Sequence, residues 1–537
     1  MLSFLAMPAA AIQLQQLRPR EQERPSAYAE RIGCAYADLA PPEHKRSLGQ
    51  YFTPLAVARF MAQMHRGGGK RLRALDPGAG AGILSCALCE SLASGTEKIG
   101  EIELETYESD IALAGCLEHS LTYAKEWLLK KGVNLKFKIH TDDFVLSNAE
   151  ILSDSLSLFP SPALHRENFD LVIANPPYFK LPKSDPRAQA AAAIVWGQPN
   201  IYAIFMAISA QMLREDGEMI VISPRSYAAG NYFQLFRERF FARMRPDAIH
   251  LFDSRREAFS RDEVLQENII VRAQRMSNWT NNRQAEVEVS RSAGVHDLSR
   301  SRKRLVPLAE VLDVNSADKV LRIPLADEDD EIVRIIRSWP GNLHSYGLEI
   351  STGPVVPFRA VPLISQAGSV PQTHAPLLWM QNVTAMRVDW PVTTRNKPQY
   401  IVTNEQSRPL LVKNQSYVLL RRFSAKESAR RLIAAPLLAG AIDAPFVGLE
   451  NHLNYAHRPG GELSAEEAYG LATLFNSALL DRYFRTFNGN TQVSATELRA
   501  MPLPPLNLIK TLGEQALADK SNLASLDDLV DSLFMRR

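Results

Sequence analysis

The chain has 537 residues, of which 46% are hydrophobic and 22% are charged, and its formal net charge is +2. This length exceeds what one hydrophobic core organises, so we expect two or three domains. The nearly balanced charge excludes a bulk polycation but is compatible with a locally basic cleft. No apolar run reaches the roughly 18 residues of a membrane span, and four cysteines are too few for a disulfide scaffold. These features predict a cytoplasmic protein without a membrane partner.

The pattern of residues changes three times along the chain. Residues 1–47 read as an N-terminal helical segment, and residues 48–280 alternate apolar strand-like runs with helical runs. Residues 281–329 lose this alternation and read as a connecting region, whereas 330–537 combine short β-like runs with C-terminal helices. Alternating strands and helices are typical of a doubly wound α/β sheet with right-handed crossovers. The sequence therefore predicts a Rossmann-like α/β domain followed by a mixed α+β domain.

A glycine-rich turn follows the first predicted strand of the α/β region. The run Asp76-Pro77-Gly78-Ala79-Gly80-Ala81-Gly82 ends that strand and precedes a helix. Glycines such as Gly78 and Gly80 allow the backbone to pass close to a ligand, although this spacing alone suits any nucleotide. Asp76 is an acceptor, which favours a cationic group over a phosphate. Upstream, Thr53-Pro54 reads as a helix start with Thr53 as the N-cap.

Acidic residues follow the next two predicted strands. Glu108 comes after the strand 102–107, and Asp143 with Phe144 comes after the strand 135–140. An acid at the first of these positions commonly binds ribose hydroxyls. Asp143 can accept a hydrogen bond from an adenine amino group, with Phe144 against the ring. Three successive strand ends bearing these residues favour a nucleoside site over three solvated loops.

The fourth predicted strand, 169–174, ends in Asn175-Pro176-Pro177-Tyr178. Two consecutive prolines cannot donate to a ladder, so the strand stops there and the turn is stiff. The Asn175 carboxamide and the Pro176 carbonyl are two neighbouring acceptors, which suit an exocyclic amino group. Tyr178 offers a flat face for stacking a planar ring. The sequence thus favours a nucleobase amino group as the substrate over an ordinary proline-stopped turn.

No cluster of residues calls for a metal. Cys86 and Cys89 lack a second pair and read as core cysteines. His452 and His457 have no acidic or cysteine ligands at the usual spacing. We therefore expect no metal site.

Taken together, these motifs resemble the gamma group of adenine-N6 DNA methyltransferases, type II restriction–modification enzymes with a C-terminal target-recognition domain. The resemblance covers residues 48–275 through three runs: Gly49-Gln50-Tyr51-Phe52-Thr53-Pro54, Asp76 to Gly80, and Asn175 to Tyr178. It implies S-adenosylmethionine as the cofactor. It also implies roles for the matching positions: Tyr51 and Thr53 near the methionine part, Asp76, Gly78 and Gly80 along the binding turn, Glu108 at the ribose, Asp143 and Phe144 at the cofactor adenine, Asn175, Pro176 and Pro177 at the reacting amino group, and Tyr178 with Phe259 around the flipped base.

The implied reaction moves a methyl group to the N6 amino group of an adenine flipped out of duplex DNA. Flipping costs a few kcal/mol, and stacking on Tyr178 would offset ~1–3 kcal/mol of that cost. The resemblance implies a monomer on double-stranded DNA and a cognate restriction endonuclease that acts separately. Alternatives that keep the fold are cytosine-N4 DNA, RNA or protein amino-methyltransferases. A non-catalytic DNA-recognition protein is an alternative of another class.

The C-terminal region resembles target-recognition domains through Gly347–Gly353 and Gly489–Arg499. Basic residues of this region are candidates for phosphate contacts or for a solvated surface: Arg421, Arg422, Lys426, Arg430 and Arg431. The basic run Arg300–Arg304, before this region, has the same two interpretations.

Overall fold

The computed structural model describes most of the chain as two compact units. Unit 1 is Met1–Leu325 and unit 2 is Ala326–Arg537. The described residues are 17–95, 98–154, 169–195, 199–253, 267–281, 285–316, 318–368, 370, 373–392, 397–425, 427–518 and 523–535.

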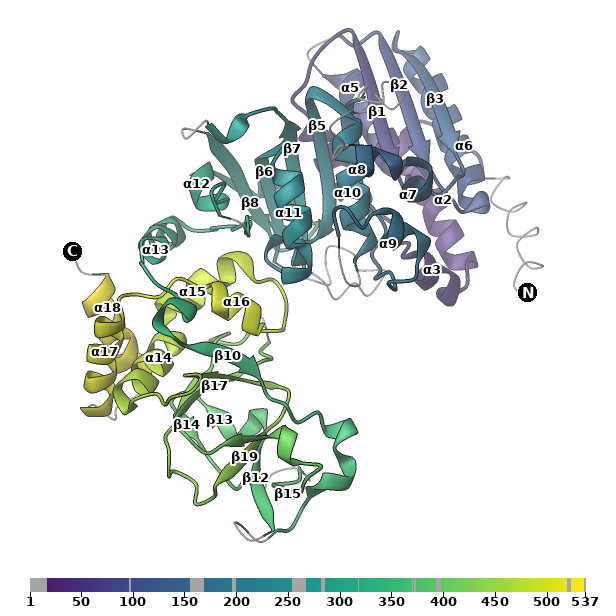
Figure 1. Cartoon of the computed structure of the whole chain (residues 1–537). Helices are drawn as coiled ribbons and strands as arrows, with labels where there is room; N and C mark the ends of the chain where they lie inside the picture. Colours follow the sequence, from purple (N-terminus) through teal and green to yellow (C-terminus); the bar gives the residue numbers. More distant parts are fainter. Residues whose placement is uncertain are drawn as a thin grey trace. The chain divides into compact units, whose positions relative to one another are not determined.

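In the described part of unit 1, nine strands form one sheet in the order β3-β2-β1-β4-β5-β7-β6-β8-β9 (Figure 1). Their bounds are β1 Arg71–Pro77, β2 Glu101–Tyr107, β3 Asn134–His140, β4 Phe169–Ala174, β5 Leu213–Pro224, β6 Met244–Phe252, β7 Asn268–Arg275, β8 Glu286–Ser292 and β9 Arg302–Pro307. Strands β1 to β5 pair in parallel, whereas β7 runs antiparallel to both β5 and β6. Strand β8 is parallel to β6, and β9 is antiparallel to β8. The chain order jumps from β3 to β4 across β2 and β1, so β1 and β4 meet at the centre of the sheet, where ligands of such folds bind.

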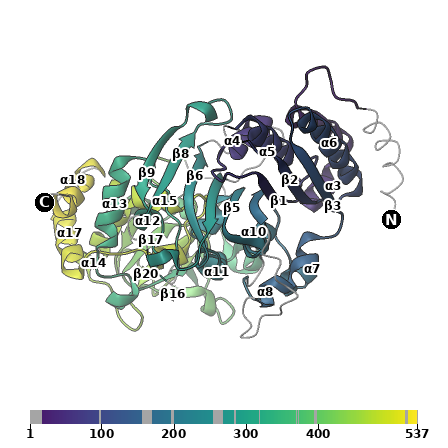
Figure 2. The ribbon, with the colours of Figure 1, turned by 90° about the horizontal axis from the view of Figure 1, so that it is seen from above.

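Helices cover both faces of this sheet, as Figure 2 shows for α4, α5 and α6 on one side and α10 and α11 on the other. Strand β4 explains why both faces are apolar. Its residues Leu171 and Ile173 pack into one buried cluster, and Val172 and Ala174 pack into the other. Side chains alternate across a strand, so a continuous apolar run serves two cores. The predicted doubly wound α/β class is confirmed.

The helices of unit 1 begin before the sheet and then alternate with its strands. Their bounds are α2 Pro25–Leu39, α3 Pro42–Leu48, α4 Leu55–Gln63, α5 Ile83–Ser94, α6 Ile111–Leu129, α7 Phe144–Asn148, α8 Glu150–Asp154, α9 Pro186–Ala190, α10 Ile201–Met212, α11 Gln234–Phe241 and α12 Leu308–Val311. The prediction that Thr53 caps α4 is wrong. Pro54 is the N-cap residue and makes no side-chain cap hydrogen bond, and the Glu30 carboxylate accepts from the Leu55 N–H at 3.0 Å instead.

The region after residue 280, expected to connect the two domains, contributes to the sheet. Residues 286–292 and 302–307 form β8 and β9. The interpretation as a connector was wrong for these residues because β8 pairs with β6 and β9 pairs with β8, so the sheet continues where the regular alternation of strands and helices in the sequence ends.

Unit 2 contains no second large parallel sheet in its described residues. One sheet has the order β10-β20-β17-β18, a second has β11-β15-β12-β19-β16, and β13 pairs with β14. The strands are β10 Glu349–Thr352, β11 Ile364–Ser365, β12 His374–Leu378, β13 Val383–Thr384, β14 Arg387–Val388, β15 Tyr400–Val402, β16 Leu411–Lys413, β17 Tyr417–Arg421, β18 Ala434–Leu437, β19 Phe446–Leu449 and β20 Leu453–His457. The helices are α13 Asp327–Arg337, α14 Ala465–Asn476, α15 Ala478–Phe487, α16 Ala495–Ala500, α17 Leu506–Ala518 and α18 Leu523–Phe534.

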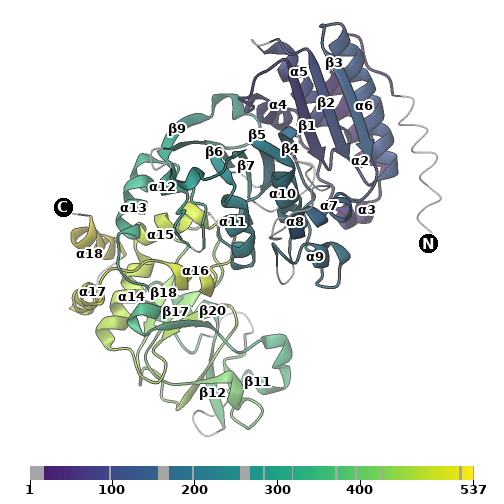
Figure 3. The same ribbon diagram turned by 45° about the horizontal axis from the view of Figure 1, so that its top comes forward.

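Two glycines set how closely the helices of unit 2 pack. A side chain at Gly470 of α14 would overlap the carbonyl of Ile509 on α17, and one at Gly513 of α17 would overlap the carbonyl of Glu466. Figure 3 shows α17 beside α14, with α18 next to it. Their backbones touch because both positions lack a Cβ. No helix in the described residues of either unit has the length and hydropathy of a membrane span.

Candidate active site

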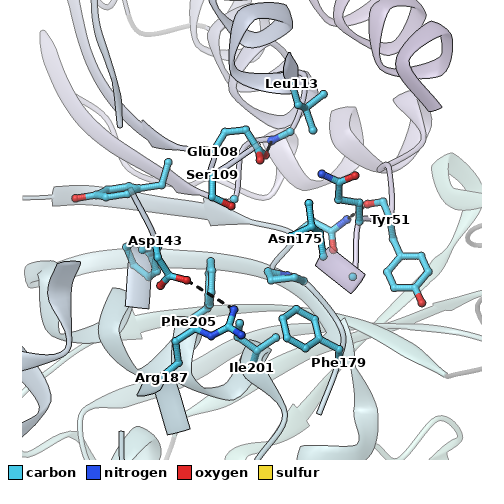
Figure 4. A pocket seen from close by; sticks show the side chains of 18 of the residues that line it. Tyr51, Glu108, Ser109, Leu113, Asp143, Asn175, Phe179, Arg187, Ile201 and Phe205 are labelled. Atoms are coloured by element: carbon cyan, nitrogen blue, oxygen red, sulfur yellow. Dashed lines mark hydrogen bonds and ion pairs between the residues drawn. The ribbon is translucent and has the colours of Figure 1, made fainter. Parts of the chain in front are cut away.

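A pocket of about 760 Å³, counted with the part open to solvent, lies at the carboxyl ends of the central strands. Figure 4 shows side chains from three sequence-distant motifs converging on it. Its lining comprises Leu48, Gly49, Gln50, Tyr51, Phe52, Gly78, Gly80, Tyr107, Glu108, Ser109, Leu113, Asp142, Asp143, Phe144, Asn175, Pro177, Phe179, Arg187, Ile201 and Phe205. A second pocket shares Tyr51, Phe52, Gly78, Gly80 and Asn175 with it and also includes Thr53.

The glycine-rich turn after β1 forms one wall. The N–H groups of Gly78 and Ala79 both donate to the Tyr107 carbonyl, at 2.9 Å each, which ties the turn to the end of β2. Gly78 has φ of +81°, a left-handed conformation that L side chains rarely adopt. A Cβ on Gly78 would point toward Phe205 and Pro177, which line the pocket, so a larger residue would fill the space that a ligand needs.

Glu108 lies at the end of β2 and is buried. Its Oε2 accepts from the Gly80 N–H at 3.0 Å, and its Oε1 accepts from the Asp110 N–H at 2.9 Å. Burial raises the pKa of Glu108 to about 7, although both backbone hydrogen bonds act in the opposite direction. The carboxylate is therefore pre-positioned beside the turn as an acceptor for polar groups of a ligand.

Asp110 connects Glu108 with the N-terminal helices. Its Oδ1 accepts from the N–H groups of Ala112 and Leu113 and so caps α6, while its Oδ2 lies 2.7 Å from His44 Nε2 and accepts from the Tyr36 hydroxyl. Burial alone would raise the pKa of Asp110, but the hydrogen bonds from Tyr36 and His44 lower it overall. Asp110 is thus an ionised residue that supports the pocket wall.

Asp143 and Phe144 form the wall at the end of β3. Asp143 is the N-cap of α7, and its Oδ1 accepts from the Leu146 N–H at 3.0 Å. Its Oδ2 lies 3.7 Å from Nη1 of Arg187. Phe144 is buried and meets Tyr107 edge-on and Phe205 at a tilt. A carboxylate beside aromatic faces suits the amino edge of a planar heterocycle.

Asn175 follows β4, and its amide has a fixed orientation. Its Nδ2 donates to the Tyr51 carbonyl at 3.0 Å and to Thr53 Oγ1 at 2.9 Å. The reversed orientation would set Oδ1 against the Tyr51 carbonyl, an acceptor against an acceptor. The start of α4 therefore determines that Asn175 turns Oδ1 away from this segment, where it accepts from the Tyr178 hydroxyl.

Tyr178 does not offer the open face that the sequence predicts. Its side chain is only 8% exposed, and its ring stacks on Tyr51 with centroids 5.4 Å apart. Its hydroxyl lies within hydrogen-bond distance of Asn175 Oδ1, at 2.6 Å, and of the Ile222 carbonyl, at 3.2 Å. Burial raises the pKa of Tyr178 well above its usual value, so the hydroxyl stays protonated and donates. The ring was expected to be exposed because the sequence does not reveal its packing against Tyr51.

Two other predicted positions differ from their expected placement, and a third is outside the described residues. Asp76 is fully buried beneath the turn and does not line either of the two pockets, and Ser85 donates to its Oδ2 at 2.6 Å. Pro176 is buried, whereas Pro177 lines the pocket. Phe259 lies outside the described residues. Asp76 therefore supports the turn from below in this structure.

The sequence did not single out Arg187, whose guanidinium reaches the pocket from α9. Its only signal was a charged residue in an alanine-rich loop after the Asn-Pro-Pro-Tyr run. In unit 2, both interpretations of Arg431, a phosphate contact and a solvated surface, are wrong, because Arg431 is fully buried and donates to Ser424 and Asn488. Among the described residues, no group of three or more His, Cys, Asp or Glu is arranged to hold a metal ion.

Comparison with known proteins places these motifs in a family. The model of the Eco57I restriction-modification methylase family matches residues 94–259. The type II methyltransferase M.BsuBI of Bacillus subtilis is 32% identical over 489 residues, which is 90% of this chain and 93% of the relative. M.PstI of Providencia stuartii is 30% identical over 91% of this chain and 93% of the relative. The solved type IIG restriction endonuclease BpuSI aligns with 98% of this chain and 74% of its own, at 14% identity and a TM-score of 0.43.

The pocket fits the methyl donor of such enzymes, S-adenosylmethionine. The carboxylates of Glu108 and Asp143 are acceptors for hydroxyl and amino groups, and Phe144 and Phe205 supply flat apolar contacts. The absent Cβ of Gly78 leaves room for the ligand against the backbone. The sequence-based recognition is confirmed at the level of the family: this chain belongs to the type II methyltransferases of restriction–modification systems, DNA methyltransferases that use S-adenosylmethionine.

Proposed function

We propose that the chain methylates the N6 amino group of an adenine that is flipped out of duplex DNA. The observation that carries the proposal is the fixed amide of Asn175. Both of its N–H bonds are donated to the segment before α4, so Oδ1, which now accepts from the Tyr178 hydroxyl, is the atom that would accept from a substrate at the mouth of the cofactor pocket.

The residues at the end of β4 suit an amino group. Asn175 Oδ1 and the Pro176 carbonyl would accept its two N–H bonds and draw the nitrogen lone pair out of conjugation with the ring. When bound, S-adenosylmethionine supplies an electrophilic methyl group. A nitrogen held by two acceptors is oriented for in-line attack, and orientation provides much of the rate.

Adenine is the proposed base because the motif carries Asn175. The resemblance to adenine-N6 methyltransferases implies this choice, because cytosine-N4 enzymes more often have serine where this chain has Asn175. An adenine inside a duplex cannot present its amino group, so it must leave the stack, which costs a few kcal/mol.

Tyr178 would change partners during this step. In the structure its hydroxyl donates to the same Asn175 oxygen that the amino group needs. We infer that the hydroxyl holds this acceptor before the base arrives and yields it when the base enters. The Tyr178 ring, now stacked on Tyr51, would then turn part of its face toward the base.

Unit 2 is proposed to select the DNA sequence. Two relatives match about nine-tenths of this chain, a span that includes most of unit 2, which suggests that both units serve one activity. All four candidate arginines already have protein partners: Arg421 donates to the Val383 carbonyl, Arg422 to the Asn451 carbonyl, Arg430 to the Asp527 carboxylate, and Arg431 to Ser424 and Asn488. Phosphate contacts of unit 2 would therefore involve other exposed basic residues. We also propose a monomer on double-stranded DNA and a cognate restriction endonuclease that acts separately.

The test is incubation of the chain with labelled S-adenosylmethionine and genomic DNA, followed by nucleoside analysis. Label in N6-methyladenine is expected, and the Asn175→Ala variant serves as the control that should lose it. Label recovered as N4-methylcytosine alone, or in protein alone, would overturn the proposal.

A further inference from the structure

Arg187 is held in a defined position by its own loop. It lies in the short helix α9, and the N-cap residue Asp185 accepts from its backbone N–H. The Asp185 carboxylate also accepts from Nε at 2.9 Å and from Nη2 at 2.7 Å. This two-point contact fixes the plane of the guanidinium, which makes Arg187 a pre-oriented donor.

The loop that carries Arg187 is closed at its base. The Leu181 N–H donates to the Pro199 carbonyl at 2.8 Å, and the Ile201 N–H donates to the Phe179 carbonyl at 3.0 Å. The Arg187 guanidinium lies over the Phe179 ring at 5.4 Å from its centroid. The side chain is 25% exposed, so it is held at the pocket wall and does not extend into solvent.

One nitrogen of Arg187 still has hydrogen-bonding capacity. Among the described residues, Nη1 makes no hydrogen bond, and it lies 3.7 Å from Asp143 Oδ2 (Figure 4). This distance is too long for a hydrogen bond but close enough for an ion pair. The pocket wall thus presents a donor, Nη1, beside an acceptor, Oδ2.

A donor beside an acceptor matches one edge of adenine. That edge carries the N6 amino group as a donor and the ring nitrogen N7 as an acceptor. An isolated acid would accept from the amino group alone, whereas the pair in this pocket can satisfy both atoms. A 6-oxo purine would place an acceptor against the Asp143 carboxylate, which is unfavourable.

We propose that Arg187 is a cofactor-binding residue that donates from Nη1 to N7 of the adenine while Asp143 accepts from its N6 amino group. The proposal rests on the placement of the cofactor adenine at Asp143 given above. It assigns to the loop after the Asn-Pro-Pro-Tyr run a role in holding the cofactor, and it extends the nucleoside site to a residue that no motif marks.

The test measures binding of S-adenosylhomocysteine, which cannot react, to the full chain by calorimetry. A hydrogen bond to a charged group is worth enough that Arg187→Ala should bind about tenfold to a hundredfold more weakly. Arg214→Ala is the matched control, because Arg214 pairs with Asp170 at the opposite end of β4 and should leave affinity unchanged. Equal affinities for Arg187→Ala and the unaltered chain would overturn the proposal.

Analogues of the ligand make the test specific for one atom. The 7-deaza analogue of S-adenosylhomocysteine lacks N7, so it should bind the unaltered chain more weakly than S-adenosylhomocysteine does. The Arg187→Ala substitution should not weaken binding of the 7-deaza analogue any further. The 1-deaza analogue is the control, and any loss it shows should persist in the variant. Because the 7-deaza comparison can be made on the unaltered chain, it tests the proposal even where Arg187→Ala folds poorly. Unaltered affinity for the 7-deaza analogue would refute the proposal.

A further variant separates this proposal from the placement on which it rests. Asp143→Ala should weaken S-adenosylhomocysteine binding if the adenine lies at Asp143. Dependence on Asp143 without dependence on Arg187 would reject the role of Arg187 alone. Independence from both residues would reject the adenine placement as well, while the nucleoside assay for N6-methyladenine remains a separate readout.

Discussion

The side chains of Thr53 and Asn175 form a hydrogen bond of 2.9 Å, although 122 positions separate them in the chain. Thr53 is 5% exposed, so this contact is shielded from water. The Thr53 hydroxyl, which the sequence predicted to cap α4, instead accepts from the Asn175 amide at the end of β4. The start of α4 and the end of β4 therefore act as one structure that orients the proposed acceptor.

Replacing Thr53 by valine should slow methyl transfer. Valine has the same shape but no acceptor, so Asn175 Nδ2 would keep only the Tyr51 carbonyl as a partner. A net hydrogen bond of ~0.5–1.5 kcal/mol predicts a rate about threefold to tenfold lower in single turnover. Thr53→Ser retains the hydroxyl and should react at close to the original rate. Equal rates for the valine variant and the unaltered chain would contradict the orienting role.

Replacing Asn175 by alanine should reduce kcat much more than binding. The amide oxygen matters most as the amino nitrogen becomes pyramidal, so its loss acts mainly on the transition state. A decrease of about a hundredfold to a thousandfold is expected by analogy with loss of one donor from an oxyanion hole. DNA affinity from fluorescence anisotropy should change little. A decrease in affinity that accounts for the whole loss of activity would argue against this role.

Replacing Tyr178 by phenylalanine should favour the flipped base. The ring and its stacking on Tyr51 remain, but the hydroxyl that competes for Asn175 Oδ1 is gone. With 2-aminopurine at the target position, the fluorescence signal of flipping should be equal to or up to about tenfold above that of the unaltered chain. Tyr178→Ala should lower it and also lower the melting temperature, because the ring is buried. A Phe variant that flips as poorly as the Ala variant would show that the hydroxyl assists base binding.

Binding of the cofactor product should depend on pH through Glu108. Burial raises its pKa to about 7 in the free protein, and the ionised form is the better acceptor for ribose hydroxyls. Affinity for S-adenosylhomocysteine should therefore increase from pH 6 to pH 8. The Glu108→Gln variant cannot ionise and should show a flat profile at lower affinity. A pH dependence of the same size in both proteins would assign the titration to another group.

Asp76 should make the fold less stable as the pH rises. Burial raises its pKa to about 7, well above the unfolded value near ~3.9, so the folded state prefers the protonated form. The stabilising contribution of this group is fully present below the unfolded pKa and is lost as the pH rises through about 7. The Asp76→Asn variant cannot ionise at this position and so avoids that loss. The melting temperature of the variant minus that of the unaltered chain should therefore be larger at pH 8 than at pH 5. The reverse order would contradict the raised pKa.

Local signals predicted the elements that carry the site. The apolar run of β4, the two prolines after it and the glycine-rich turn after β1 each determine backbone geometry over a few residues, and all three lie where the sequence places them. Glu108 and Asp143 were also predicted at strand ends, and both line the pocket. These positions were predictable because parallel strands bring their carboxyl ends to one edge.

Contacts between distant segments were not predictable in the same way. The Asn175 amide N–H donates to the Thr53 hydroxyl oxygen, and packing on Tyr51 removes Tyr178 from the surface. Arg431 has the same charge as any surface arginine, and only the fold shows that Ser424 and Asn488 enclose it. Arg187 reaches the pocket because its loop is closed at Phe179, which no local pattern reveals.

The two outer strands of the large sheet carry an excess of positive charge. Strand β9 begins with Arg302-Lys303-Arg304, part of the basic run for which the sequence allowed either a solvated surface or phosphate contacts. Strand β3, at the other edge of the sheet, carries Lys136 and Lys138. An outer strand offers unpaired N–H and C=O groups to any passing chain, and charges placed there repel a second copy that would add its own strand. The consequence concerns solubility. Neutral replacements of the basic residues of β9 should leave the fold intact, but the protein should then self-associate through this edge strand in concentrated solutions.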